Sequence, residues 1–575
     1  MRLFAFLTVL PLFAQPSQPP LSETERLAWF KESKFGIFFH WGAYSVIGRH
    51  EWARHRFQIP QAEYDTYAKQ FNPVNFKPEE WVNLAQNAGA KYMVITSKHH
   101  DGFSIFRSKV SGYDMEITPY GGDPLKQLAN AAQRKGMRLG FYHSIMDWHH
   151  PDYRPRRDWE SKTPNAGGNN GRYVDYMKAQ IRELLTGYGD VAMLWFDGEW
   201  EHTLRDLKRD DEVYGFIRNL QPNTLINDRL YERQAGSRGD FGTPEQFVPA
   251  TGVVDPTGKA ALWESCVTIN QDSWGYNKYE TEFKTSRDLV RMLIEVVSKG
   301  GNLLLNVGPT PDGRIQSEFV ERLEAMGRWM KVNSEAIYGT TASPFARLPF
   351  FGRATVKNNN LYLHVFEWPK DGQLRLPGIK NPVFSARILG QPNAVVGIKK
   401  ENDDVLLTLP ADPSNDIATV IALKLDTTPV TLPFSIKPNR QGVLELGAES
   451  CEIETRFEQR AKKENALGHV FVTKWTRPDD VPSWNFITPH AGRYRVEIAY
   501  GKGGRPADAA GEYTIMVGTQ KLSGKIEPTG GDWVFKPHAA GVFTLPAGEQ
   551  SLKITTNVKG TEAMQLERVT LRPER

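Results

Sequence analysis

The stretch "NAGAKYMVI", residues 87–95, decides how the first half of the chain folds. It joins the end of an amphipathic helix, a glycine, a short turn and an apolar strand. The same order recurs in "QRKGMRLGFY" (133–142) and in "TGYGDVAMLWF" (186–196). Glycine ends helices because it adopts the left-handed conformation without steric cost. Repeated units of this kind predict a parallel sheet whose faces are covered by helices.

Between residues 22 and 342, amphipathic helices alternate with apolar runs. A (β/α)8-like (TIM) barrel needs roughly 250 residues, which this region supplies. A doubly wound nucleotide-binding sheet fits less well because no glycine-rich phosphate loop follows the first strand. The predicted strands are residues 35–42, 91–100, 139–144, 192–198, 223–229, 261–267 and 302–309.

The pattern changes after residue 343, where helix signals stop. The run "LYLHVFEWPKDGQLRLPG" (361–378) is a strand, an Asp-Gly turn and a second strand. Further short strands with Gly and Pro turns predict one antiparallel β-sandwich at 343–426 and another at 430–575. We therefore expect a multidomain protein, α/β followed by all-β, with a barrel and two sandwich domains.

Composition and termini narrow the classes of partner. The 575 residues carry a formal net charge of only +4 without a long basic run, which argues against nucleic acid. Residues 1–14 are apolar after Arg2 and are interpreted as the signal peptide of a secreted or periplasmic protein. This run is too short for membrane insertion. Two cysteines, Cys266 and Cys451, exclude a disulfide framework by count and leave one interdomain bridge open.

Polar and aromatic residues gather at the ends of the predicted strands, which is the face of a barrel where chemistry occurs. Nine of the 13 histidines lie between residues 40 and 202. Aromatic rings that stack on a sugar, together with hydrogen-bonding and carboxylate groups, are typical of a carbohydrate pocket. The strand ends carry His40, His99, His100, Asp101, Tyr142, Trp195, Asp197, Arg229 and Glu264.

A metal site at His99, His100 and Asp101 is the main alternative for these residues. Neighbours on a strand point to opposite faces, and the spacing matches no recognised ligand signature. We therefore expect no metal. The residues alone favour a carbohydrate-active barrel that uses two carboxylates.

Six motifs occur in order along the first 315 residues: "FGIFFHWGAYSV", "EWARH", "SKHHDGF", "GFYHSIMDWHHPDY", "MLWFDGEW" and "GNLLLNVGPTPDGRI". Together they resemble the α-L-fucosidases of glycoside hydrolase family twenty-nine, over about residues 22–425. The resemblance implies removal of terminal α-linked L-fucose with retained configuration, a fucosylated glycan as substrate, and no metal or organic cofactor. It leaves homo-oligomerisation open.

In this family the acid of the W-x-D strand is the nucleophile, and that motif falls on Asp197, two residues after Trp195. Glu199 follows Gly198, past the expected strand end, and is interpreted as a rim or loop residue. A retaining mechanism also needs a second carboxyl group about 5 Å from the nucleophile to protonate the leaving oxygen.

The family places this acid/base residue on the variable loop after the "NDR" strand, here residues 230–260. Within it "GDFGTPEQ" (239–246) resembles the segment of broadly acting members, which points to Glu245. The other candidates on the loop and on the following strand are Glu232, Asp240 and Glu264.

The resemblance also implies a fucose-binding set. Its expected members are His40, Glu51, His99, His100, Tyr142, Trp195 and Arg229. An arginine beside the nucleophile makes physical sense because a cation keeps a carboxylate ionised. The C6 methyl group of fucose needs an apolar contact, for which Phe39, Trp41 and Phe283 are candidates.

The block at 430–575 looks like the carbohydrate-binding sandwich modules that accompany glycosidases. Trp484, Trp533 and Phe535 are candidates for stacking on sugar, and the competing interpretation is that they are core aromatics. Two other functions stay open: a retaining glycosidase of this fold with drifted specificity, toward a fucan or related sugar, and a catalytically inactive sugar-binding protein.

Overall fold

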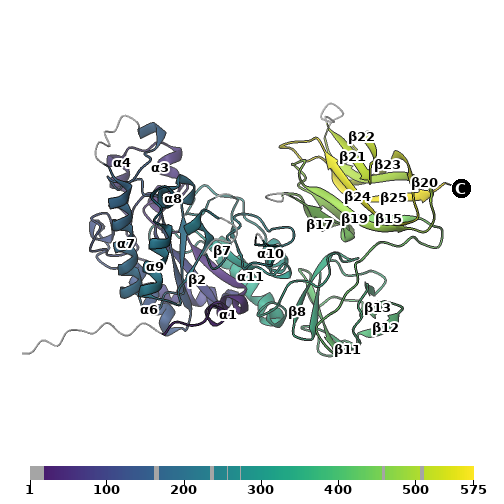
Figure 1. Cartoon of the computed structure of the whole chain (residues 1–575), viewed down its shortest axis with the longest axis horizontal. Coiled ribbons are helices and arrows are strands. Elements are labelled where there is room, and N and C mark those ends of the chain that lie inside the picture. Colours follow the sequence, from purple (N-terminus) through teal and green to yellow (C-terminus); the bar gives the residue numbers. More distant parts are fainter. Residues whose placement is uncertain are drawn as a thin grey trace, which may run out of the picture.

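The computed structural model describes residues 19–160, 168–233, 239–255, 257–271, 273–455, 460–504 and 511–574. The predicted signal peptide, residues 1–14, lies outside the described residues. Figure 1 shows a helix-rich half followed by a β-rich half. Within the described residues, no helix is long and apolar enough to cross a membrane.

Within the part of the chain that the structure describes, seven parallel strands form the sheet of the helix-rich half, in the order β5-β4-β3-β2-β1-β7-β6. Each of the predicted strands is present, and the TIM-like class is confirmed. In the register, Phe39 of β1 lies beside Ile95 of β2 and Val307 of β7. The strands are β1 (Phe35–Phe39), β2 (Tyr92–Lys98), β3 (Arg138–Ser144), β4 (Met193–Asp197), β5 (Leu225–Ile226), β6 (Glu264–Thr268) and β7 (Asn302–Val307).

An irregular segment, rather than an eighth strand, lies between β5 and β6 among the described residues. Single bridges join Phe241 to Asn227 on one side, and Gly242 to Trp263 and Glu245 to Cys266 on the other. A proline at position 244 removes a backbone donor, and Gly242 weakens strand structure, so a continuous ladder is not expected here. The expected eightfold regularity is therefore incomplete at the segment that carries Glu245.

Helices cover the outside of this sheet. Pro124 begins one of them in its first turn and the Asp123 side chain caps it. Gly89 ends another at a φ of 97°, which confirms the glycine signal in the first quoted stretch. The principal helices are α1 (Glu23–Ser33), α5 (Pro78–Ala88), α6 (Pro124–Arg134), α7 (Asn170–Gly187), α9 (Asp210–Leu220), α10 (Ser286–Ser298) and α11 (Ser317–Asn333). Short helices lie in the loops: α2 (Tyr44–Ile47), α3 (Ala53–Arg56), α4 (Gln61–Ala68) and α8 (Thr203–Leu207).

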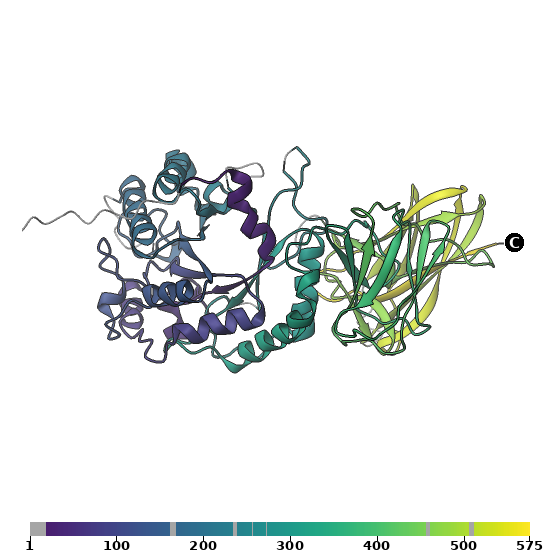
Figure 2. The same cartoon turned by 90° about the horizontal axis from the view of Figure 1, so that it is seen from below.

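The β-rich half begins with two antiparallel sheets, β10-β13-β12 and β11-β14-β9-β8. Helices α10 and α11 stand between the barrel and this half (Figure 2), and Trp329 of α11 donates a hydrogen bond to the Ala418 carbonyl. The strands are β8 (Gly352–Lys357), β9 (Asn360–Val365), β10 (Gln373–Leu376), β11 (Val383–Ile388), β12 (Gly397–Glu401), β13 (Asp404–Thr408) and β14 (Thr419–Leu425).

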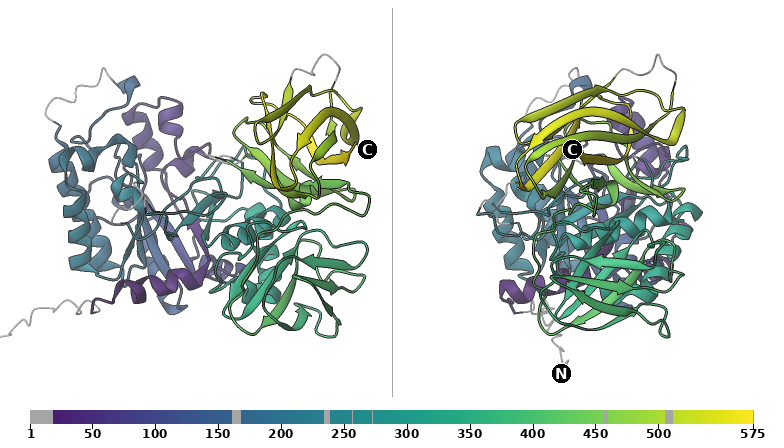
Figure 3. Two further views of the ribbon diagram at one scale, coloured as in Figure 1. Left: turned by 45° about the vertical axis from the view of Figure 1, so that its right-hand side comes forward. Right: turned by 90° about the vertical axis from the view of Figure 1, so that its right-hand side faces the viewer.

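Two further antiparallel sheets complete the chain and enclose their own buried core. They lie beside the preceding sheets, on the same side of the barrel (Figure 3). The domain boundaries inferred from the sequence stay a prediction. The strands are β15 (Leu444–Gly447), β16 (Glu452–Glu454), β17 (Lys462–Ala466), β18 (His469–Thr473), β19 (Val481–Thr488), β20 (Gly492–Lys502), β21 (Glu512–Val517), β22 (Gln520–Lys525), β23 (Gly531–Leu545), β24 (Gly548–Thr556) and β25 (Gln565–Pro573).

Inward-facing side chains fill the barrel with a cluster of large rings, including Phe38, Tyr92, Tyr142 and Trp195. A Cβ atom on Gly36 would lie 2.4 Å from the Tyr92 ring, so only glycine fits beside this filling. The barrel floor is thus closed by packed aromatic rings.

We expect Gly36→Ala to lower the free energy of unfolding by about 1–3 kcal/mol, because the buried Tyr92 ring cannot move away without disturbing its neighbours. Gly215→Ala on α9 is the matched control, since a Cβ there meets no atom within 4 Å. In a helix this change stabilises by about 1 kcal/mol. Comparison of thermal unfolding midpoints tests the pair, and an unaltered midpoint for Gly36→Ala would contradict the packing argument.

Candidate active site

A pocket opens at the carboxyl ends of the barrel strands. Eight of the nine site residues expected from the sequence line it, and Glu51 does not. The lining residues are Phe38, His40, Trp52, His99, His100, Tyr142, Trp195, Asp197, Trp200, Arg229, Glu245 and Trp274.

Asp197 is the last residue of β4 and is only 8% exposed. Its Oδ1 accepts a hydrogen bond from Arg229 Nη1, and its Oδ2 accepts one from the Tyr142 hydroxyl at 2.8 Å. His100 Nε2 lies 3.4 Å from the same oxygen. Burial alone would raise the pKa of Asp197, but the charge of Arg229 and the Tyr142 hydrogen bond outweigh burial and lower it. The carboxyl group is therefore ionised at neutral pH.

Glu245 approaches the same arginine from the segment that bridges to β6. Its Oε2 accepts hydrogen bonds from Arg229 Nη2 at 2.9 Å and from Arg233 Nη2 at 3.2 Å. The Arg229 guanidinium is further held by Thr243, whose hydroxyl lies 3.0 Å from Nε. One buried guanidinium thus contacts both Asp197 and Glu245, while the Glu245 side chain keeps 33% exposure.

Three histidines form one wall of the pocket. Burial lowers the pKa of His40 to about 3 and lowers those of His99 and His100 well below the usual value. All three rings are therefore neutral at neutral pH. His40 Nδ1 lies 2.7 Å from the Asn306 amide oxygen, and His99 stacks on Tyr142 with ring centres 5.4 Å apart. Neutral imidazoles of this kind can hydrogen-bond sugar hydroxyls without adding charge.

Glu264 lies beneath the pocket, at the beginning of β6, and is fully buried. It accepts hydrogen bonds from the Tyr92 hydroxyl and from Trp195 Nε1. Burial raises the pKa of Glu264 to about 7. Because Trp195 in turn packs under the Arg229 guanidinium at 4.3 Å, Glu264 supports the site from below and does not line it.

Glu51 is also buried and acts on a wall of the pocket. Its Oε2 accepts hydrogen bonds from the backbone N–H groups of Trp274 and Gly275, both at 2.9 Å. The Asn306 amide donates to the Trp274 carbonyl at 2.7 Å. The structure therefore places Glu51 behind Trp274, where it fixes the loop that carries that ring.

A protein-family model described as Alpha-L-fucosidase matches residues 13–335, more than half of the chain. The chain belongs to the α-L-fucosidase family. It is accordingly a glycoside hydrolase.

Three solved structures illustrate the likeness. Isoenzyme 1 from Paenibacillus thiaminolyticus is 39% identical with a TM-score of 0.67, covering 70% of this chain and 99% of its own. The fucosidase from Vibrio sp. strain EJY3 is 26% identical with a TM-score of 0.73, covering 96% and 98%. The Bacteroides thetaiotaomicron enzyme, a trapped covalent intermediate in complex with 2-fluoro-fucosyl fluoride, is 28% identical with a TM-score of 0.64, covering 73% and 100%.

Four lining aromatics of this fucosidase were not found from the sequence: Phe38, Trp52, Trp200 and Trp274. Phe38 has the same strand parity as His40 and so faces the barrel interior, whereas Phe39 and Trp41 pack with Trp81 outside the pocket. Strand parity could have identified Phe38. Phe283 packs against Phe319 and does not line the pocket either.

Two more aromatics stand at the edge of the pocket. The rings of Trp52 and Trp200 stack with centres 6.3 Å apart, and Trp200 is 42% exposed. Trp52 and Trp200 both lie within the quoted motifs, so their place at the pocket could have been predicted from those motifs. Trp274 lies in a loop without periodicity, and its place depends on the distant Glu51.

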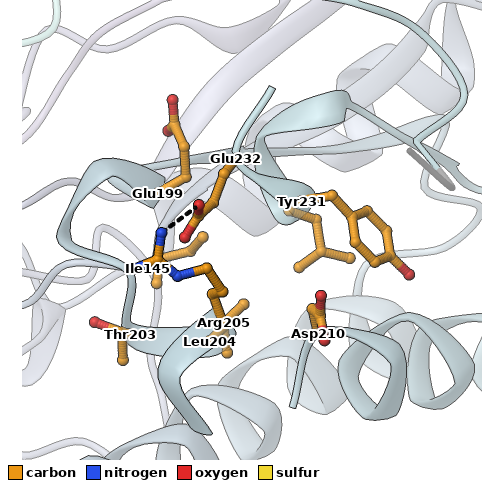
Figure 4. A pocket seen from close by; sticks show the side chains of 9 residues that line it. Ile145, Glu199, Thr203, Leu204, Arg205, Asp210, Tyr231 and Glu232 are labelled. Carbon is orange, nitrogen blue, oxygen red and sulfur yellow. Dashed lines mark hydrogen bonds and ion pairs between the residues drawn. The ribbon is translucent and has the colours of Figure 1, made fainter. Parts of the chain in front are cut away.

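The other acid/base candidates lie outside the pocket. Asp240 pairs with Arg26 and Arg218. Glu232 pairs with Arg205 at 3.2 Å beside a separate small pocket, which Figure 4 shows.

Glu199, which directly follows Gly198, is buried and is not exposed on the rim. Its Oε1 accepts a hydrogen bond from Arg233 Nε at 2.7 Å, and it also lines the small pocket of Figure 4. The 3-10 turn Glu199–Glu201 explains this, because it folds the chain back directly after the strand. Burial raises the pKa of Glu199.

Arg229→Gln is expected to raise the pKa of Asp197, because the carboxyl group would stay buried without its counter-charge. If Asp197 is the nucleophile, as the family resemblance implies, it would then be protonated at higher pH, and the acidic limb of kcat/KM should move up by about one to three pH units. Arg229→Lys keeps the charge and should move the limb less. A pH profile measured on an aryl fucoside checks both, and an unshifted limb in Arg229→Gln would disprove the electrostatic role.

Proposed function

We propose that this protein is a retaining exo-α-L-fucosidase, which hydrolyses terminal α-linked L-fucose from glycans through a covalent fucosyl-aspartate intermediate. Asp197 is the proposed nucleophile and Glu245 the proposed acid/base residue. One observation carries the proposal. The Arg229 guanidinium contacts both carboxyl groups and so holds them in the same pocket.

In the first step the Asp197 carboxylate attacks the anomeric carbon, and the bond to the leaving oxygen breaks as Glu245 donates its proton to that oxygen. In the second step Glu245 takes a proton from water, and this water releases fucose from Asp197. The environments suit the two roles. Asp197 is buried and ionised beside Arg229, whereas Glu245 is partly exposed, where a leaving group and water can reach it.

Two arginine contacts hold the Glu245 carboxyl group in the ligand-free structure. The longer one, 3.2 Å from Arg233 Nη2, lies on the exposed side. We infer that the leaving-group oxygen replaces this contact when substrate binds. Support for the covalent step comes from the Bacteroides relative, which was solved as a trapped covalent intermediate.

The shape of the pocket favours a terminal sugar. Its floor is closed by Phe38, Tyr142 and Trp195, so a chain cannot pass through it. His40, His99 and His100 are proposed to bind the sugar hydroxyls together with Arg229. We propose Glu51 as a positioning residue that holds Trp274 instead of touching fucose.

The segment 239–246 suggests broad acceptance of simple aryl fucosides. The alternatives are a related glycosidase with drifted specificity and an inactive sugar-binding protein. The full set of pocket residues argues against inactivity, because a protein that only binds sugar does not need an ionised Asp197 facing Glu245.

We further propose secretion or periplasmic location and a carbohydrate-binding-like role for residues 430–575. Among the candidate stacking residues, Trp484 is a core residue: it is fully buried and donates to the Gly447 carbonyl. Phe535 packs against His469 and Phe471, and Trp533 is 52% exposed. A sugar contact in this module would therefore centre on Trp533.

Asp197→Gly should abolish turnover of an aryl α-L-fucoside while leaving the unfolding midpoint close to that of the wild type. Loss of the nucleophile costs several orders of magnitude in kcat. Azide fits the vacated space and should restore part of the rate, giving a fucosyl azide of inverted configuration. An aryl β-galactoside serves as the substrate control. Near wild-type activity of Asp197→Gly would end the assignment.

Glu245→Ala should lose little in the glycosylation of a dinitrophenyl fucoside, because a good leaving group departs without protonation, and much on a natural disaccharide. Azide should give a fucosyl azide of retained configuration. Glu264→Gln is the matched control, since it neutralises a buried carboxyl group outside the pocket. Leaving-group dependence in Glu264→Gln, with Glu245→Ala resembling wild type, would move the acid to β6.

A further inference from the structure

A second and larger cleft lies between the barrel and the β-rich half, which we call the interdomain cleft. Its volume is about 790 Å³. One wall is a face of α10 with the residues before it and residues 246–248, and the other is formed by β8 and β17. Figure 1 shows α10 on the side of the barrel that faces these strands. The catalytic mechanism uses none of these side chains.

The walls of the interdomain cleft carry a clear excess of positive charge. Among the described residues that line it, nine are lysine or arginine and five are aspartate or glutamate, an excess of four. The cations come from both sides. Lys284, Arg287 and Arg291 belong to the barrel, whereas Lys462 and Lys463 lie in β17 and Lys474 directly follows β18. This local excess is as large as the net charge of the whole chain, +4.

Several of these cations are held by neutral acceptors. Lys284 Nζ donates to the carbonyls of Thr268 at 2.7 Å and Asn270 at 2.9 Å. Arg291 donates to the Phe366 carbonyl at 2.8 Å, and also to one further carbonyl and one amide oxygen. Carbonyl oxygens fix the positions of these groups without neutralising their charge. The cleft therefore presents fixed positive charge.

Like charges also converge across the cleft. Burial lowers the pKa of Lys284 to about 8. The carboxylate of Asp288 opposes this shift, and the nearby charge of Lys474 adds to it. Lys462 adds to this effect, although it pairs with Asp288 at 3.4 Å. Charges of one sign in a partly enclosed cleft repel each other, and a bound anion would relieve that repulsion.

The interdomain cleft adjoins the catalytic pocket through one short segment. Glu245 lines the pocket, and the next residue, Gln246, lines the cleft. Gln246 is fixed by a hydrogen bond from its backbone N–H to the Cys266 carbonyl and from its side-chain amide to Thr268. Consecutive residues of this segment thus face two different cavities, and a ligand in the cleft would lie beside the acid/base residue.

We propose that the interdomain cleft binds an acidic glycan, bearing sulfate esters or carboxylates, and holds a polyanionic chain beside the catalytic pocket. Lysine and arginine bind both anionic groups through charge-assisted hydrogen bonds. The proposal rests on the proposed function only in that glycans are the substrates of this protein.

The test uses the full chain and measures binding to dextran sulfate, to polygalacturonate and to neutral dextran. Arg287→Gln combined with Lys474→Gln removes two exposed cations from the cleft. Lys380→Gln combined with Lys399→Gln removes the same charge from the loop after β10 and from β12, outside the cleft, and is the matched control. We expect the cleft variant to bind the polyanion about tenfold more weakly, and the control to bind like wild type.

Hydrolysis of a small aryl fucoside should be unchanged in both variants, because none of the four side chains lines the catalytic pocket. Binding of only one polyanion would show whether sulfate or carboxylate is preferred. Equal binding of neutral dextran, an equal loss in the control variant, or equally tight binding of double-stranded DNA would overturn the proposal. If the wild type does not hydrolyse aryl fucosides, that result counts against the proposed function. It does not affect the binding test, because the binding assay does not depend on turnover.

Discussion

The contact of one guanidinium with two carboxyl groups is the constraint on which the rest of the site depends. Arg229 must be buried to hold Asp197 ionised, and a buried charge is tolerated only with full compensation. Asp197 and Glu245 supply that compensation together, and Trp195 packs under the guanidinium. Removing one partner of such a buried pair typically costs about 3–5 kcal/mol. The same contacts that stabilise Arg229 therefore fix the relative positions of the two carboxyl groups in the pocket.

Two further buried carboxyl groups hold neighbouring parts of the pocket in place. Glu264 fixes Trp195 from within the barrel, and Glu51 fixes the loop of Trp274 from outside it. Burial raises the pKa of each to about 7, which shows how strongly both are desolvated. Carboxyl groups kept at such a cost usually hold neighbours in place or take part in chemistry. In this site their hydrogen bonds point to positioning.

The sequence allowed prediction of the seven strands because each is an apolar run bounded by glycine or a polar end. It also allowed prediction of most pocket residues, because parallel strands bring their carboxyl ends to one face. Trp274 could not be predicted, since its position depends on a hydrogen bond to Glu51, more than 200 residues away. The segment at Glu245 also could not be predicted from a pattern, because it makes only single bridges to its neighbours and forms no regular strand. Family resemblance, and not periodicity, supplied that residue.

Covalent labelling would show directly whether Asp197 forms the fucosyl-enzyme. The full chain would be incubated with 2-fluoro-fucosyl fluoride, a reagent that slows release of the fucosyl-enzyme, then digested and mapped by mass spectrometry. We expect a single 2-fluoro-fucosyl ester on the peptide that contains Asp197. A label on Glu199 or Glu245, or complete turnover of the reagent without any enzyme adduct, would show that Asp197 is not the nucleophile.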